Sequence, residues 1–215
     1  MRARLVALAL MLPGAVAAGP ASERALYLQP LGPALATADV EAVERALGVV
    51  YALPVRRLPP EPLPKEAYYP PRKRYRAERL LDFLTPRLPQ DGWRILGLTG
   101  VDISTTKDRV PDWGVMGLAN IDGPAGVISM FRCRKGAAGE AHARIRLAKV
   151  AVHEIGHALG LEHCPARGCL MEDAGGKVAT TDREVDLCAR CRARLRALGR
   201  SIPDAPTLPW PRPRP

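Results

Sequence analysis

One stretch constrains this chain more than any other. Residues 150–171, VAVHEIGHALGLEHCPARGCLM, hold three of its 4 histidines and two of its 5 cysteines. His153 and His157 are four positions apart, which on a helix places both imidazoles on one face, about one turn apart. That separation allows both side chains to bind one zinc ion. Apolar residues around them recur at steps of three and four, which predicts a helix from Ala141 that ends near Gly160.

The same stretch carries a candidate base and a third ligand. Glu154 follows His153 directly, and there its carboxylate can reach a water on the metal and act as general base. H-E-x-x-H alone is a weak motif, because many helices contain it by chance. Here Gly160 allows a sharp turn that brings His163 to the same ion. The predicted ligands His153, His157 and His163 leave a fourth position open, as in catalytic zinc sites.

The extended motif HEIGHALGLEH resembles that of the metzincin clan of metallopeptidases. Such enzymes carry a methionine beneath the zinc, and Met171 stands at a suitable place. The residues that follow resemble the signature of the archaemetzincins. That signature continues from the third histidine as C-x4-C-x-M, with C-x2-C downstream. The matching residues here are Cys164, Cys169, Met171, Cys188 and Cys191. The resemblance covers about residues 26–199.

The resemblance implies a metzincin-like fold of class α/β (α+β). A twisted mixed sheet would carry an active-site helix, and a second metal site would close a small C-terminal helical subdomain. The single peptidase domain would span residues 24–200, divided into an upper part at 24–163 and a lower part at 164–200. Hydrolysis of peptide bonds by a zinc-activated water, with Glu154 as general base, is the implied activity. A peptide or protein substrate would pair with a sheet-edge strand at residues 114–121.

The four cysteines Cys164, Cys169, Cys188 and Cys191 are taken in archaemetzincins to bind a second, structural zinc. Their paired short spacings suit a closed tetrahedral thiolate site. Two disulfides are the alternative, because an exported protein meets an oxidising compartment. Cys133 ends a predicted strand and is expected to be a buried thiol without a role.

The remaining pattern predicts a mixed α/β chain. Seven prolines between residues 54 and 71 predict an extended loop without sheet or helix. Thr37 or Asp39 is expected to cap the first helix, and a capping-box pattern at Thr181 predicts the start of the last one. Strands are predicted at residues 26–33, 48–55, 93–104, 114–121 and 126–132, and further helices at 37–48 and 75–88.

Both ends of the chain differ from its middle in composition. MRARLVALALMLPGAVAAGP begins with arginines and continues with a short apolar run and small residues, the layout of a secretory signal at residues 1–18. Its removal would lower the formal charge from +10 to +8, and the protein would be periplasmic or extracellular. An uncleaved N-terminal anchor is the alternative. Residues 201–215 are rich in proline and arginine and are predicted to be a disordered tail.

The positive charge favours a second hypothesis, a zinc-stabilised binding module without catalysis, with a basic surface for nucleic acid. The sequence feature that supports this hypothesis is a C-x2-C pair in a segment that also carries Arg190, Arg192, Arg194 and Arg196. Those arginines fall mostly on the outer face of a predicted helix, which is a common solvated arrangement. We therefore expect no nucleic-acid partner, and no membrane partner after signal cleavage. A third hypothesis retains fold and metal but lacks turnover.

Overall fold

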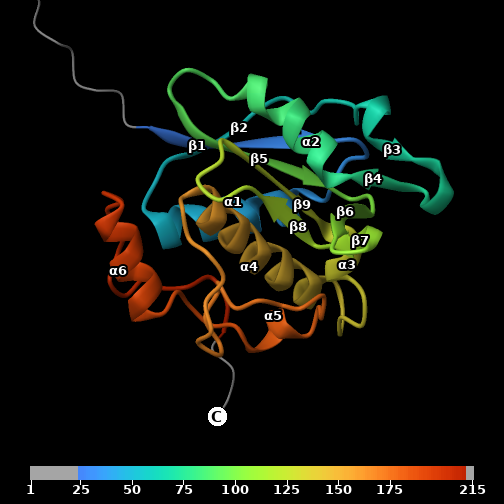
Figure 1. The fold of residues 1–215 in the computed structure, drawn as a ribbon. Helices are drawn as coiled ribbons and strands as arrows, with labels where there is room; N and C mark the ends of the chain where they lie inside the picture. Colours follow the sequence, from blue (N-terminus) through green and yellow to red (C-terminus); the bar gives the residue numbers. More distant parts are fainter. Residues whose placement is uncertain (1–23, 212–215) are drawn as a thin grey trace, which may run out of the picture.

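The computed structural model describes residues 24–211 (Figure 1). The predicted signal at residues 1–18 and the last four residues of the predicted tail lie outside the described residues. Within the described part, no helix has the length and apolar character that crossing a bilayer requires.

A five-stranded sheet forms the centre of the fold, in the order β2-β1-β5-β9-β8. Its first four strands are parallel, and β8 runs antiparallel to β9 at one edge. Its strands are β1 (Ala25–Leu31), β2 (Val55–Arg57), β5 (Gly92–Thr99), β8 (Gly117–Ala119) and β9 (Ala125–Ser129). β1 and β9 are buried on both faces, as their nearly continuous apolar sequences indicate.

Helices cover both faces of this sheet (Figure 1). α1 (Thr37–Tyr51) and α4 (Glu140–Ala158) lie on one face, and α2 (Ala77–Leu84) lies on the other. Alternate strand residues separate the two cores: Leu26 packs with α1 and α4, whereas Tyr27 packs with α2. Helix α4 therefore packs against both the sheet and α1.

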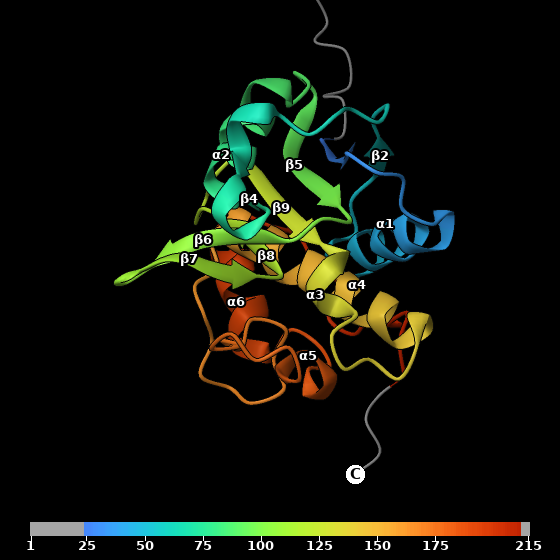
Figure 2. The same ribbon diagram turned by 90° about the vertical axis from the view of Figure 1, so that its right-hand side faces the viewer.

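A second sheet has the order β3-β4-β6-β7. Figure 2 shows its β6–β7 hairpin projecting away from the body of the molecule. The strands are β3 (Tyr68–Tyr69), β4 (Arg74–Arg76), β6 (Ile103–Lys107) and β7 (Val110–Val115). The sequence predicted one strand across β5 and β6, but the chain changes sheets at residues 100–102. It returns at Met116, so the predicted strand 114–121 is divided between β7 and β8.

Three further predictions in the first half are wrong. Residues 48–51 belong to α1 and not to a strand, because Val50 and Tyr51 complete the buried face of that helix. Neither Thr37 nor Asp39 caps α1; Asp39 is buried and accepts a hydrogen bond from Arg144 Nε at 2.9 Å. The proline-rich stretch is largely extended, yet it contains β2, β3 and the 3₁₀ turns η1 (Lys65–Ala67) and η2 (Pro70–Arg72). The predicted helix 75–88 is α2 followed by η3 (Thr85–Arg87).

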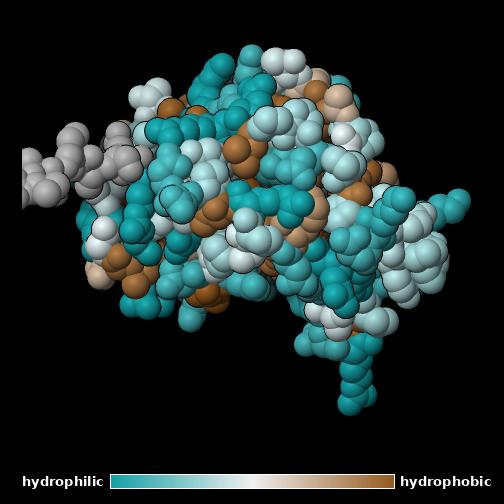
Figure 3. Space-filling view, turned by 90° about the horizontal axis from the view of Figure 1, so that it is seen from above, coloured by the Kyte–Doolittle hydropathy of each residue, from teal (hydrophilic) through white to brown (hydrophobic). Residues whose placement is uncertain are grey.

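The last part of the chain lies beneath α4. The predicted final helix is broken into α5 (Thr180–Arg183) and α6 (Ala189–Ala197). Residues 201–211 form no helix or strand, and two of their side chains, those of Ile202 and Trp210, are buried. Trp210 is 5% exposed and donates a hydrogen bond from Nε1 to the carbonyl oxygen of Val185 at 2.9 Å. The face of the molecule seen in Figure 3 is mostly hydrophilic, with hydrophobic residues scattered in small groups.

Candidate active site and metal centres

Helix α4 presents two of the three predicted zinc ligands on one face. The Nε2 atoms of His153 and His157 lie 3.0 Å apart. α4 ends at Ala158, and Gly160 then adopts a φ of 98°, a left-handed conformation that favours glycine. This turn brings His163 back, with its ring centroid 4.8 Å from that of His157 and 5.3 Å from that of His153. The structure thus brings the three predicted histidines together.

The orientation of the two helix imidazoles fits a cation between them. Nδ1 of His153 lies 2.7 Å from the carbonyl oxygen of Leu170, and Nδ1 of His157 lies 2.7 Å from that of Leu161. Because carbonyl oxygens only accept, both Nδ1 atoms carry the proton and both Nε2 atoms present lone pairs. Two lone pairs at this distance repel each other unless a cation lies between them. Zinc–nitrogen bonds of about 2.0–2.1 Å in a tetrahedral site separate two ligand atoms by about 3.3 Å, close to the observed spacing.

Burial keeps these imidazoles neutral, which is the form that binds metal. It lowers the pKa of His153 to about 3, and the neighbouring His157 lowers it further. The pKa of His157 is also lowered by burial. His163 is half exposed, so the site opens to solvent on its side.

Glu154 lies at the wall of the same site. Its side chain is only 6% exposed, and its carboxylate has no hydrogen-bond or ion-pair partner within residues 24–211. Burial raises the pKa of Glu154 to about 8. Gly117, the first residue of β8, faces it closely: a Cβ atom at Gly117 would lie 2.6 Å from Glu154 Oε1. The strand edge therefore approaches the carboxylate because residue 117 has no side chain.

Met171 supports α4 from below. It is fully buried, and its sulfur packs on Gly156 so closely that a Cβ atom there would lie 2.4 Å from Sδ. Tyr51 reaches the same helix from α1 and donates a hydrogen bond from its hydroxyl to the Val152 carbonyl oxygen at 2.6 Å. The helix that carries the histidines is thus held by contacts that need glycine at position 156.

A cleft of about 650 Å³ runs over these residues. Strand β8 forms its upper edge, and the segment after Met171 forms the opposite wall. Asp173 lines this wall; its Oδ2 lies 3.9 Å from His163 Nδ1, and its Oδ1 accepts from the backbone N–H of Gly175 at 2.8 Å. The predicted edge strand thus borders the cleft along Gly117–Ala119.

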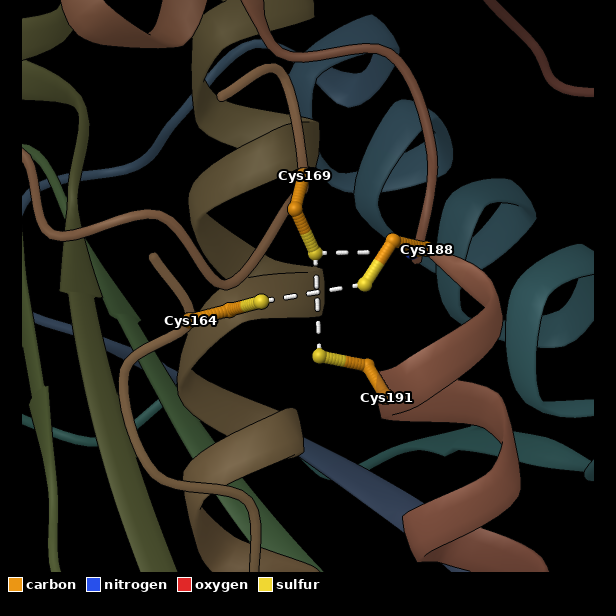
Figure 4. Close-up of side chains that lie close together, drawn as sticks. All are labelled: Cys164, Cys169, Cys188 and Cys191. Carbon is orange, nitrogen blue, oxygen red and sulfur yellow. Dashed lines mark hydrogen bonds between the residues drawn. The ribbon is translucent and has the colours of Figure 1, made fainter. Parts of the chain in front are cut away.

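A second cluster lies below α4 and unites the four predicted cysteines (Figure 4). The Sγ atoms of Cys164 and Cys188 are 3.7 Å apart, as are those of Cys169 and Cys191. Sulfur atoms in a disulfide are about 2.05 Å apart, whereas tetrahedral zinc–sulfur bonds of about 2.3 Å separate them by about 3.8 Å. The observed spacing therefore fits four thiolates around one ion.

The surroundings of Cys169 favour a thiolate. The hydrogen bond between Cys169 and Cys191 is the main cause that lowers the pKa of Cys169 to about 5. The backbone N–H groups of Cys188 and Met171 also donate to its sulfur, at 3.4 and 3.5 Å. Cys188 stands at the N-cap of α6, where the helix dipole also favours negative charge.

Comparison with known proteins agrees with this arrangement. Residues 45–197 match the model of Peptidase family M54. The chain belongs to this family. The archaemetzincin of Haloarcula marismortui is 32% identical over 171 residues, which cover 76% of this chain and 94% of that protein. The archaemetzincin of Archaeoglobus fulgidus is 31% identical over 171 residues, which cover 80% of this chain and 98% of that one.

Solved archaemetzincin structures share the fold. The Archaeoglobus fulgidus protein, solved in complex with malonate, has a TM-score of 0.66 at 31% identity and covers 79% of this chain and 98% of its own. The Methanopyrus kandleri protein has a TM-score of 0.70 at 25% identity, with coverages of 85% and 99%. Membership of this family makes the chain a zinc metallopeptidase, which is a hydrolase, and confirms the predicted metzincin-like fold.

The remaining cysteine and histidine of this chain, Cys133 and His142, lie outside both clusters. Cys133 is a buried thiol, but it lies in α3 (Met130–Cys133) and not in a strand, because the Ser129 side chain caps that helix at Phe131 N. His142 lies on α4 away from the cleft and contacts Asp182, with Nε2 2.6 Å from Oδ1. Neither residue joins a metal cluster among the described residues.

Sequence reasoning missed the residues that shape the archaemetzincin site without binding the metal. The carbonyl groups of Leu161 and Leu170 orient two imidazoles, and Tyr51 and Gly117 position α4 and the strand edge. Every residue has a backbone carbonyl group, so the sequence does not show which of these groups accepts a hydrogen bond from a histidine. Only the H-E-x-x-H spacing could suggest that such partners exist.

Proposed function

We propose that this member of the archaemetzincin family hydrolyses peptide bonds with His153, His157 and His163 holding the catalytic zinc and Glu154 acting as general base. The observation that carries the proposal is the convergence of three imidazoles and one buried carboxylate on the floor of a single cleft. Three protein ligands leave room for water and substrate.

The metal, Glu154 and two backbone carbonyl groups each have a separate role in the proposed hydrolysis. When zinc is bound, it acts as a Lewis acid on the scissile carbonyl and lowers the pKa of water. Glu154 accepts the proton of the attacking water and returns it to the nitrogen of the leaving amine. The carbonyl groups of Leu170 and Leu161 hold two imidazoles in the tautomer that binds metal.

Substrate binding is proposed at the free edge of β8. Within residues 24–211, this strand pairs with β9 on one side only, so the backbone groups on its other side can bind an extended peptide. Antiparallel addition is the more stable geometry. The peptide would then pass between β8 and the floor of the cleft, with its scissile bond near Glu154.

We further propose that Cys164, Cys169, Cys188 and Cys191 bind a second, structural zinc. The sulfur spacing and the low pKa of Cys169 support it. Export, which the signal-like sequence of residues 1–18 predicts, is part of the proposal and leaves two disulfides as the competing outcome. Zinc analysis and intact mass of the purified exported protein distinguish the two outcomes, because disulfides remove thiol hydrogens and bind no zinc.

The competing hypothesis of a basic binding module has less support in the structure. Arg192 is buried and pairs with Asp186, and Arg196 pairs with Asp204 of the C-terminal segment. These guanidinium groups already have acidic partners, so less of the positive charge of α6 is available to a nucleic acid.

A peptide mixture tests the proposed activity. Zinc-loaded protein, chelator-treated protein and the Glu154→Gln variant are each incubated with it, and the products are read by mass spectrometry. We expect cleavage by the zinc-loaded protein alone, with its recovery when zinc is returned to the chelated sample. Equal cleavage by the variant would contradict the role of Glu154.

A further inference from the structure

An acidic side chain without a partner lines the cleft beyond the metal site. Glu184 directly follows α5 and is only 2% exposed, yet it forms part of the cleft wall. Among residues 24–211, its carboxylate has no hydrogen-bond donor and no cation within ion-pair distance. Buried carboxylates are ordinarily paired, because an unpaired buried charge is costly.

The main chain fixes Glu184 beside the active-site helix. Its carbonyl oxygen accepts a hydrogen bond from Lys149 Nζ at 2.6 Å, and the Thr181 carbonyl oxygen accepts from the same atom at 2.7 Å. Lys149 lies four residues before His153 on α4, which is about one turn. The main chain of Glu184 is therefore anchored to the turn of α4 that precedes His153, and Val150, which follows Lys149, lines the same cleft.

The cations nearest to this part of the cleft are already engaged. Lys149 is held by the two carbonyl groups and makes no ion pair with the Glu184 carboxylate. Arg132, which lines the cleft, donates two hydrogen bonds to Asp102, at 2.8 and 3.1 Å. Arg183 pairs with Glu172. Burial raises the pKa of Glu184 to about 8 even though Lys149 opposes the shift.

The direction of the bound peptide determines which substrate residue meets Glu184. Strand β8 begins at Gly117, above Glu154, and Trp113 in β7 precedes it along the cleft. A peptide antiparallel to β8 places the residues after its scissile bond beside the start of that strand. The chain after β8 reaches the later part of α4, where the Asp122 N–H donates to the His157 carbonyl oxygen at 2.9 Å, so the start of β8 faces the earlier turns of α4. Val150 lies on those turns, and Lys149 anchors Glu184 to them.

We propose that Glu184 selects substrates that carry arginine or lysine directly after the scissile bond. This inference rests on the proposed peptidase function and adds a substrate class to it. The cationic side chain enters beside Val150 and donates hydrogen bonds to the carboxylate of Glu184, which no protein donor occupies. A proton held by the empty carboxyl group leaves to solvent as the cation enters.

Two peptides that differ in one residue test the proposal. One carries arginine after the scissile bond, and the other carries citrulline, which has nearly the same shape without the charge. The expected kcat/KM ratio of arginine to citrulline peptide is about 10–100, from the strength of a hydrogen bond between charged groups. Glu184→Gln should reduce this ratio to near one. A wild-type ratio near one, or a ratio unchanged in the variant, would overturn the proposal.

Glu162→Gln is the matched control, because it removes an exposed carboxylate from the same cleft. Solvent screens an exposed charge, so the ratio should stay close to that of the wild type. A fall as large as that in Glu184→Gln would show that any acid in the cleft has this effect, and the proposal would be wrong.

Binding measurements separate failure of this proposal from failure of the peptidase function. Both peptides, fluorescently labelled, are titrated into zinc-loaded Glu154→Gln protein, with and without Glu184→Gln, and anisotropy gives the Kd. Tighter binding of the arginine peptide, lost in the double variant, supports the role of Glu184 even if neither peptide is cut. Equal binding of both peptides contradicts it, whatever the wild-type protein cleaves.

Discussion

Nδ1 of His153 lies 2.7 Å from the carbonyl oxygen of Leu170, and Leu170 stands between Cys169 and Met171. The residue that orients a proposed zinc ligand is therefore directly bonded to a residue of the four-cysteine cluster. The Cys164 N–H also donates to the Met171 carbonyl oxygen at 2.7 Å, which closes the loop between them. The cysteine cluster thus fixes the loop on which the orientation of His153 depends.

Loss of a cysteine should affect both metal sites. Cys188→Ala should remove one zinc per chain and weaken the affinity of the remaining site by about 10-fold or more, because a supporting contact loosens. Zinc content measured against a graded chelator reports both effects. Cys133→Ala, which removes a buried thiol outside the cluster, should leave zinc content and affinity unchanged. An unchanged affinity of the histidine site in Cys188→Ala would show that the two sites are independent.

Gly156→Ala should destabilise the protein although alanine favours helices. The gain in helix propensity is about 1 kcal/mol, whereas overpacking a well-filled core costs about 1–3 kcal/mol. The new Cβ atom would lie 2.4 Å from the Met171 sulfur, so the second effect should prevail. Gly48→Ala in α1 is the control, because its Cβ atom would meet nothing closer than 3.8 Å. Urea unfolding should show opposite signs for the two variants, and equal stabilisation would contradict the close contact.

Gly117→Ala should reduce turnover more than metal binding. A methyl group there would lie 2.6 Å from Glu154 Oε1 and displace the carboxylate, while the three imidazoles stay in place. We expect kcat to fall by about 10- to 100-fold, a part of the contribution of a general base. Kinetics and zinc analysis on the same preparation check this. A parallel loss of zinc would mean that the glycine supports the metal site itself.

Asp182 should contribute to stability in a pH-dependent way. Hydrogen bonds from Arg146, followed by that from His142, lower the pKa of Asp182 to about 2. A lowered carboxyl pKa stabilises the folded state above the unfolded value of about 4, and this stabilisation is lost as the pH falls towards 2. Asp182→Asn should therefore lower the free energy of unfolding by about 1 kcal/mol at pH 7, because the side chain is 34% exposed and partly screened. The difference from wild type should shrink below pH 4; a constant difference across that range would contradict the assignment.

The sequence predicted the fold class and which residues cluster better than it predicted where helices and strands begin and end, for a physical reason. Zinc is bound by a few side-chain types, above all histidine and cysteine, at spacings that chain geometry allows, so the residues of HEIGHALGLEHC indicate a metal site by themselves. Val50 and Tyr51 are β-branched or aromatic and were predicted as strand, yet their packing against α4 makes them helical. Glu184 gave no signal at all, because its unpaired state depends on where distant cations lie.

A comparison of wild-type protein with Glu154→Gln at equal zinc content tests the role of Glu154 most directly. Zinc per chain is measured first, and kcat/KM is then determined for one peptide that the wild-type protein cleaves. We predict unchanged zinc content and a kcat/KM lower by about 100- to 10,000-fold, the usual contribution of a general base. Equal kcat/KM values at equal zinc content would contradict the central claim that Glu154 moves the proton in this site.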